Sequence, residues 1–311
     1  MDDASHDIFI NSDDIAFSFV FEGAAVRGEL VRLGPATADD IITRHALPDE
    51  LGRLLGEMLA LSALCGASLK FNGRMIVELR AEYQNEETPL EFIVAEFNTD
   101  GTLRGMVKRR PVFYDEFSHS GLPHTLPNLF GMGILLITID QGAGMERYQG
   151  QVAIEADSIA ELAETYFMQS EQIPSKIILA ARKSDDKHAE WSSYGFMIQR
   201  VAADITRGVT EDLWDEAVMK FETLSPDELL DREIAPGEIL HRLYHENEIV
   251  VFKPKYLLAR CTCNREKLVL LMSQMPKEDT EFLIENDGQI HARCEFCNTT
   301  YHIDPSELKA R

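Results

Sequence analysis

The chain has 311 residues, 45% of them hydrophobic and 27% charged, and its 53 acidic residues outnumber its 30 basic ones to give a net charge of −23. This length and composition predict a globular protein of about two domains. The acidity argues against binding of duplex nucleic acid or docking on anionic lipid, because both need a basic surface.

The first two hundred residues show strand and helix patterns without the strict alternation of a parallel sheet. Strands are predicted at 15–21, 26–33, 75–80, 90–97, 103–108, 133–139 and 151–155. Thr37 is expected to cap a short helix ending at His45, Pro48 begins a long amphipathic helix, and Ser158 caps a third helix. The turn at 98–101 joins two strands directly, which predicts an antiparallel meander. This order of elements favours an α+β fold: a mixed N-terminal domain with an antiparallel sheet.

The composition changes near Asp204. Residues 204–248 contain 13 acidic and 4 basic side chains, a net charge of −9. Helical periodicity persists, and start signals at Ser225 and Pro236 predict short amphipathic helices. Helices of roughly ten to fourteen residues are marginal alone, so their order must come from burying an apolar face against the folded domain. The residues expected to be buried are Leu213, Trp214, Val218, Phe221, Leu229, Leu230, Ile239 and Leu240.

Four of the five cysteines lie near the end of the chain. Cys261 and Cys263 are followed, thirty residues later, by Cys294 and Cys297. Two close cysteine pairs in a reduced compartment are the usual ligand set of tetrahedral zinc, so we predict one Zn²⁺ per chain on these four thiolates. Such a short tail has little core, and metal would supply much of its folding energy. On spacing alone, a purely structural zinc site remains an alternative. The fifth cysteine, Cys65, lies in an apolar helical context and is expected to be a buried core thiol.

Other chemical groups are expected to have ordinary roles. His241 and His245 are four residues apart but lack the glutamate of a zincin, so surface or capping roles are expected. His291 and His302 lie near the cysteines, and either is an alternative ligand in place of one cysteine. No Gly-Lys-Ser/Thr follows the glycine-rich segments, so neither an ATP site nor any other cofactor site is predicted, and no catalytic residue is assigned.

The cellular location is predicted from the lack of a membrane-span pattern and of a secretory-signal pattern in the sequence. No apolar run approaches the roughly 18 residues of a membrane span. The N-terminus is acidic and lacks the cationic region of a secretory signal. We therefore expect a cytoplasmic protein without membrane contact, in a compartment where thiols stay reduced.

Several stretches, together with the cysteine pattern, resemble one family closely. They are residues 100–105, 137–150, 169–174 and 287–304. They resemble the heat shock protein 33 family, redox-regulated chaperones of the bacterial cytosol, over nearly the whole chain. The departures are an extended acidic N-terminus and a longer connection at 108–121.

The resemblance implies a mechanism and a division into three parts. These are a folded chaperone core (1–207), a metastable helical linker (208–260) and a redox-switch zinc domain (261–311). In the family, oxidants convert the zinc-bound thiolates into disulfides, here Cys261–Cys263 and Cys294–Cys297, and zinc leaves. The linker then unfolds, and the protein dimerises and holds unfolding client proteins without ATP. It is a stress-response chaperone and not an enzyme.

Two other function classes were weighed. A constitutive structural zinc ribbon would serve as a nucleic-acid or protein adaptor, but residues 261–311 contain 6 basic and 9 acidic side chains and offer no basic surface. A thiol oxidoreductase would need a βαβ pattern around its cysteines, and none is present.

Overall fold

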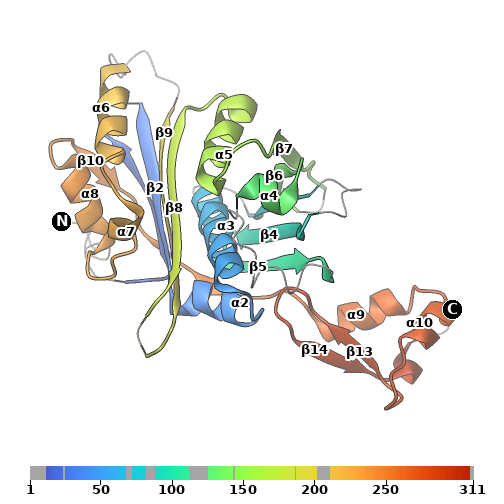
Figure 1. The fold of residues 1–311 in the computed structure, drawn as a ribbon. Coiled ribbons are helices and arrows are strands. Elements are labelled where there is room, and N and C mark those ends of the chain that lie inside the picture. The colour runs from blue at the N-terminus through green and yellow to red at the C-terminus, as the bar shows by residue number, and fades with distance from the viewer. Residues whose placement is uncertain are drawn as a thin grey trace. The chain divides into compact units, whose positions relative to one another are not determined.

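The computed structural model describes residues 12–23, 25–67, 72–81, 88–111, 125–142, 144–185, 187–201 and 211–308 (Figure 1). The chain divides into two compact units, residues 1–259 and 260–311, which we call the first unit and the C-terminal unit. The acidic N-terminal residues before position 12, most of the connection at 108–121 and the start of the predicted linker lie outside the described residues.

Within the described ranges, the first unit contains two sheets. Sheet 1 has the order β10 (Ile249–Val251), β1 (Ile15–Phe21), β2 (Val26–Leu33), β9 (Trp191–Arg200) and β8 (Ser175–Lys183), with β11 (Lys255–Tyr256) also paired to β1. Sheet 2 has the order β12 (Leu258–Ala259), β5 (Thr102–Arg109), β4 (Leu90–Asn98), β3 (Arg74–Arg80), β6 (Ile134–Asp140) and β7 (Tyr148–Ala153). All the pairings are antiparallel except β12 with β5. The helices and strands together confirm the predicted α+β class.

The helical elements fall into three groups. The part of the first unit before residue 202 has η1 (Pro35–Asp39), α2 (Asp40–Thr43), α3 (Asp49–Ala67), α4 (Leu126–Phe130), α5 (Ile159–Tyr166) and η4 (Phe167–Glu171). Later in the first unit come α6 (Glu211–Phe221), α7 (Pro226–Leu229) and α8 (Pro236–Tyr244). The C-terminal unit has α9 (Arg265–Met272), α10 (Lys277–Phe282), the strands β13 (Ile290–Arg293) and β14 (Thr300–Ile303), and η5 (Pro305–Glu307).

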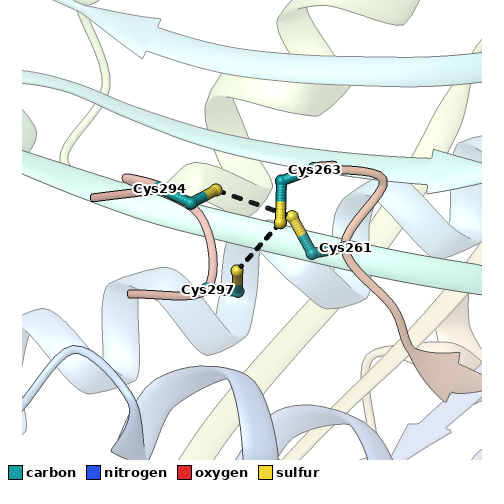
Figure 2. Close-up of side chains that lie close together, drawn as sticks. All are labelled: Cys261, Cys263, Cys294 and Cys297. Atoms are coloured by element: carbon teal, nitrogen blue, oxygen red, sulfur yellow. Dashed lines mark hydrogen bonds between the residues drawn. The ribbon is translucent and has the colours of Figure 1, made fainter. Parts of the chain in front are cut away.

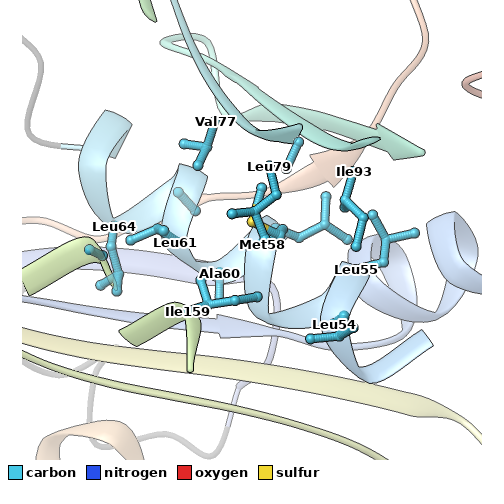
Figure 3. Close-up of a cluster of buried hydrophobic side chains, with 14 of the residues drawn as sticks. Leu54, Leu55, Met58, Ala60, Leu61, Leu64, Val77, Leu79, Ile93 and Ile159 are labelled. Carbon is cyan, nitrogen blue, oxygen red and sulfur yellow. The ribbon is translucent and has the colours of Figure 1, made fainter. Parts of the chain in front are cut away.

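Helix α3 lies between the two sheets and is buried along almost its whole length. Leu55, Met58 and Leu61 pack in one cluster with Val77 of β3 and Ile93 of β4 (Figure 3). On its other side the helix approaches sheet 1 closely. A Cβ at Gly56 would lie 2.7 Å from the Cβ of Ala181, and the Ser193 hydroxyl donates a 2.6 Å hydrogen bond to the Gly56 carbonyl. The predicted amphipathic helix is thus the centre of the main core.

The opposite face of sheet 1 is covered by α6, α7 and α8. We call these three helices and the strands β10–β12 that follow them the linker segment (211–259). The phenylalanines of β1 at positions 17, 19 and 21 face these helices, as alternation along a strand requires. The predicted burial is confirmed: Trp214, Phe221, Leu229, Leu230, Ile239 and Leu240 are buried, and Leu213 and Val218 pack against them partly buried. Both faces of sheet 1 are therefore covered and carry mainly apolar side chains.

Several predicted elements need correction. Thr37 does not cap a helix, because the helical segment already begins at Pro35 and the Thr37 hydroxyl bonds instead to Asp14. β7 begins at Tyr148, three residues before the predicted start. The strands β8 and β9 were not predicted, nor were β10 to β14. The meander β3–β4–β5 and the Ser158 cap, whose Oγ accepts from the Glu161 N–H, are confirmed.

Candidate metal centre

The four C-terminal cysteines lie in two short segments outside helices and strands. Cys261 and Cys263 lie in the extended segment before α9, whose N-cap is Asn264. Cys294 and Cys297 lie in the turn that joins β13 to β14. There the Cys294 N–H donates to the Thr299 carbonyl at 2.9 Å, and the Asn298 N–H donates to the Cys294 carbonyl at 2.8 Å. The pair Cys294 and Cys297 is therefore held by backbone hydrogen bonds within its own turn.

The four sulfur atoms converge on one point (Figure 2). The Sγ atoms of Cys261 and Cys294 lie 3.7 Å apart and those of Cys263 and Cys297 lie 3.4 Å apart, and all four are within 4.8 Å of one another. A tetrahedral zinc ion with bonds of about 2.3 Å separates its sulfur ligands by about 3.8 Å. The spacing and the soft thiolate donors therefore fit zinc, and the cluster is able to hold a metal ion.

The thiols do not ionise equally. Burial, with contacts to the other cysteines, raises the pKa of Cys263 to about 12. Burial also opposes ionisation of Cys297, but hydrogen bonds with Thr299 and contacts with neighbouring thiols outweigh it and lower its pKa to about 7. Metal binding must displace the proton of Cys263. Acid therefore weakens the metal complex, because protons compete for the same sulfur atoms.

The C-terminal unit has a very small apolar core. Among its described residues, the buried hydrophobic side chains are Ile290, Cys297 and Ile303, whereas Phe282 is 95% exposed. Burial of the two isoleucines is worth about 3–6 kcal/mol. Ordering a chain costs about 1.5 kcal/mol per residue, so this core alone is too small to fold the unit. A metal ion held by the four thiols would add folding energy that this core does not supply.

The thiol centre continues directly from the linker segment. Cys261 follows the last residue of β12 after one intervening residue. β12 pairs with β5 next to the turn at Gly101, which has φ +93° and whose carbonyl accepts from the Leu258 N–H at 3.1 Å. A side chain at Gly101 would lie 2.5 Å from the Tyr256 carbonyl oxygen. The 100–105 stretch thus contacts β12, the strand that connects the linker helices to the cysteines.

A partly buried polar cluster fastens the linker helices to sheet 1. Arg32 of β2 is fully buried and donates hydrogen bonds to the backbone carbonyls of Asp231, at 3.1 Å, and Ile234. Its guanidinium lies 4.7 Å from the centre of the Tyr194 ring. Asp13 accepts from the Tyr194 hydroxyl at 2.6 Å and from Arg232 at 2.8 Å. We call Arg32, Tyr194, Asp13 and Arg232 the polar latch.

The stretches at 137–150 and 169–174 have a structural role. The hydroxyls of Tyr148 and Tyr166 donate to the same carboxylate oxygen of Glu171, at 2.8 and 3.0 Å. A Cβ at position 150 would lie 2.8 Å from the Tyr166 ring, so only glycine fits there. These contacts fasten the β6–β7 hairpin to α5 and η4.

The remaining candidate residues lie outside the thiol centre. Cys65 is buried in α3, where burial raises the pKa of its thiol to about 12. His241 and His245 are exposed on and just after α8, with ring centres 5.7 Å apart. His291 and His302 are grouped with Asp287 and not with the sulfur atoms. No helix among the described residues is long and apolar enough to span a membrane.

Comparisons with a family model, with protein sequences and with solved structures all match the same kind of protein. Residues 14–304 match the family model described as Hsp33 protein. The 33 kDa chaperonin of Caulobacter vibrioides is 38% identical over 294 residues, covering 94% of this chain and 95% of its own. The 33 kDa chaperonin of Serratia proteamaculans is 32% identical over 301 residues, which cover 97% of this chain and 96% of that protein. The crystal structure of the 33 kDa chaperonin of Thermotoga maritima has the same fold, with a TM-score of 0.77 at 23% identity over 95% of this chain and 96% of that one.

Proposed function

Because this chain belongs to the Hsp33 family of chaperones, we propose that it is a redox-regulated holdase that binds unfolding proteins without ATP. Oxidation of Cys261, Cys263, Cys294 and Cys297, with release of one bound Zn²⁺, activates it. The observation that carries this proposal is the convergence of four thiols on a unit with almost no core. That unit continues directly from a segment covering an apolar sheet face.

The reduced protein is the inactive state. The four thiolates hold zinc, which supplies the cross-link that folds the C-terminal unit. The linker segment is then anchored at both ends. Its helices pack on sheet 1 through the apolar cluster and the polar latch, and its last strands pair with β1 and β5. The apolar face of sheet 1 is closed to client proteins.

Oxidation removes the metal ligands. With a peroxide as oxidant, two peroxide molecules accept four electrons from the four thiolates, giving two disulfides, a free Zn²⁺ ion and four hydroxide ions. Disulfide sulfur is a poor zinc ligand, because the thiolate is the form that binds metal. The C-terminal unit loses its main source of stability and no longer holds the end of the linker segment.

Release of the linker segment would expose the client-binding surface. The net charge of −9 over residues 204–248, which include the three linker helices, opposes docking, and so does the entropy of ordering short helices. The residues of sheet 1 that would be uncovered are Ile15, Phe17, Phe19, Phe21, Val26, Leu30, Phe196 and Ile198. A contiguous aromatic and aliphatic face of this kind suits unfolded segments of many sequences. The family also leads us to propose a homodimer as the active form, a cytoplasmic location and no enzymatic activity.

The parts of this mechanism correspond to the predicted division into a core (1–207), a linker (208–260) and a redox domain (261–311). We propose that the linker behaves as a separate folding unit, although in this structure it packs within the first unit. Its contacts with sheet 1 are the ones that oxidation would break.

The two disulfides should not form together. We propose that they join Cys261 with Cys263 and Cys294 with Cys297. A Cys-x-Cys disulfide closes a small, strained ring, and strained disulfides are more easily reduced. Cys294–Cys297 should therefore appear first under mild peroxide and resist reduction longer, as peptide mapping by mass spectrometry would reveal. A dominant Cys261–Cys294 bond in partly oxidised protein would contradict the proposed pairing.

The proposed function is tested by measuring how far the protein suppresses the aggregation of a heat-labile client enzyme. Reduced, zinc-loaded protein should suppress aggregation poorly, peroxide-treated protein should suppress it strongly, and added ATP should change neither result. Equal suppression by both forms would favour the alternative of a constitutive zinc-ribbon adaptor. Lack of suppression by the oxidised form would refute the holdase proposal.

A further inference from the structure

The β13–β14 hairpin has two different faces. Its register pairs Ile290 with Ile303 and His291 with His302, and side chains alternate between faces along each strand. Ile290 and Ile303 are buried, and Tyr301, on their face, contacts the Cys263 Sγ through its hydroxyl at 3.0 Å. The two histidines therefore lie on the face opposite to the one that contacts the thiol centre.

On that opposite face three metal-binding groups meet. The rings of His291 and His302 lie 4.4 Å apart at 75°. The Oδ2 atom of Asp287 lies 2.8 Å from the Nε2 atom of His291, and one donor atom from each of the three residues lies within 4.8 Å of the other two. These contacts join the turn before β13 to both strands of the hairpin.

The position of the carboxylate is fixed before any ligand binds. The Oδ1 atom of Asp287 accepts the Gln289 N–H at 3.0 Å, which leaves Oδ2 directed at the imidazole. The side chains of Asp287 and His291 are 51% and 29% exposed, so the group is open to solvent. Two imidazoles and one carboxylate are a common protein ligand set for zinc and related cations, with water in the remaining position.

We propose that Asp287, His291 and His302 form a second metal site, separate from the thiol centre, for a divalent transition metal of the zinc, nickel and copper class. It has three ligands, none of them a thiolate, and is exposed. It should therefore hold its ion more weakly than the thiol centre and exchange it readily. The high negative charge of the chain favours its loading by attracting cations.

Occupancy of this site has a consequence for the hairpin. The three ligands come together only when β13 and β14 are paired, so an ion bound to them stabilises the folded hairpin by mass action. The turn containing Cys294 and Cys297 lies between these strands. The second ion would thus stabilise the element that carries half of the thiol centre. The site itself does not depend on the proposed chaperone function.

The test is a zinc titration of the full-length reduced chain, first loaded at the thiol centre. Equilibrium dialysis against increasing free Zn²⁺, with elemental analysis, should show one ion retained throughout and a second ion bound only at higher free Zn²⁺. His291→Ala and His302→Ala should each abolish the second step and keep the first. Asp287→Asn, which retains the side-chain oxygen that accepts from Gln289, should shift the second step to higher Zn²⁺.

The matched control is the double variant His241→Ala, His245→Ala, which removes the close histidine pair of α8 and the residue after it and should keep both steps. The first ion reports on folding in every variant, because it needs the intact thiol centre. Absence of a second step in the wild type would overturn the proposal. So would a second step that survives both single histidine changes or is lost in the control. Loss of both ions in His302→Ala would place this histidine in the thiol centre and overturn the separate site.

Discussion

Replacing Cys263 and Cys297 together with serine should remove zinc from the protein and produce a holdase that is active without oxidant. The two changes take one ligand from each cysteine pair, and serine does not replace a thiolate on zinc. The C-terminal unit would then have to fold on Ile290 and Ile303 alone. Because zinc supplies about 10 kcal/mol or more to such a unit, its loss should unfold it in most molecules.

The matched control for this variant is Cys65→Ala. This thiol is buried in α3, in the first unit, and is not part of the four-thiol cluster. The variant should keep its zinc and remain inactive until it is oxidised. Elemental analysis of both proteins after gel filtration, followed by the aggregation assay, compares them directly. Full zinc content in the double serine variant would contradict the ligand assignment.

The second large effect is expected from Trp214→Ala, which should give holdase activity in the reduced protein while zinc remains bound. Trp214 lies in α6, is 9% exposed and packs in the cluster between the linker helices and sheet 1. Truncating a buried tryptophan costs about 3–5 kcal/mol. The total stability of a whole domain is only about 5–15 kcal/mol, so a short docked segment should be substantially released.

Met219→Ala is the control on the same helix, because Met219 is 65% exposed and buries little surface. It should leave the linker docked and the reduced protein inactive. Activity is read from client aggregation, and zinc content is measured on the same samples. A Trp214→Ala protein that stays inactive until oxidised would show that docking of α6 does not control the chaperone.

The thiol centre was predictable because each cysteine pair is recognisable from its short spacing in the sequence. Two cysteine pairs at short spacing indicated one tetrahedral site, and the structure brings the four sulfur atoms together. The bounds of β1 and β2 were also predictable, because alternating apolar residues and a glycine turn mark a hairpin. The amphipathic spacing of the linker likewise indicated which side chains would be buried.

The surface beneath the linker was not predictable from local patterns. β9 is buried on both faces, by α3 on one side and the linker helices on the other, so its sequence shows no alternation and includes Ser192, Ser193 and Gly195. The polar latch joins Arg32 to carbonyls 199 and 202 residues away. The histidine pair on the β13–β14 hairpin depends on strand register, which spacing alone did not reveal.

The central claim is that oxidation releases the linker helices from sheet 1 while the rest of the first unit stays folded. Amide hydrogen exchange on the full-length protein, reduced with zinc and oxidised without it, measures this directly. We expect residues 211–251 to be protected in the reduced form and to exchange rapidly in the oxidised form, with α3 protected in both. Strong protection of residues 211–251 in the oxidised, zinc-free protein would contradict the mechanism.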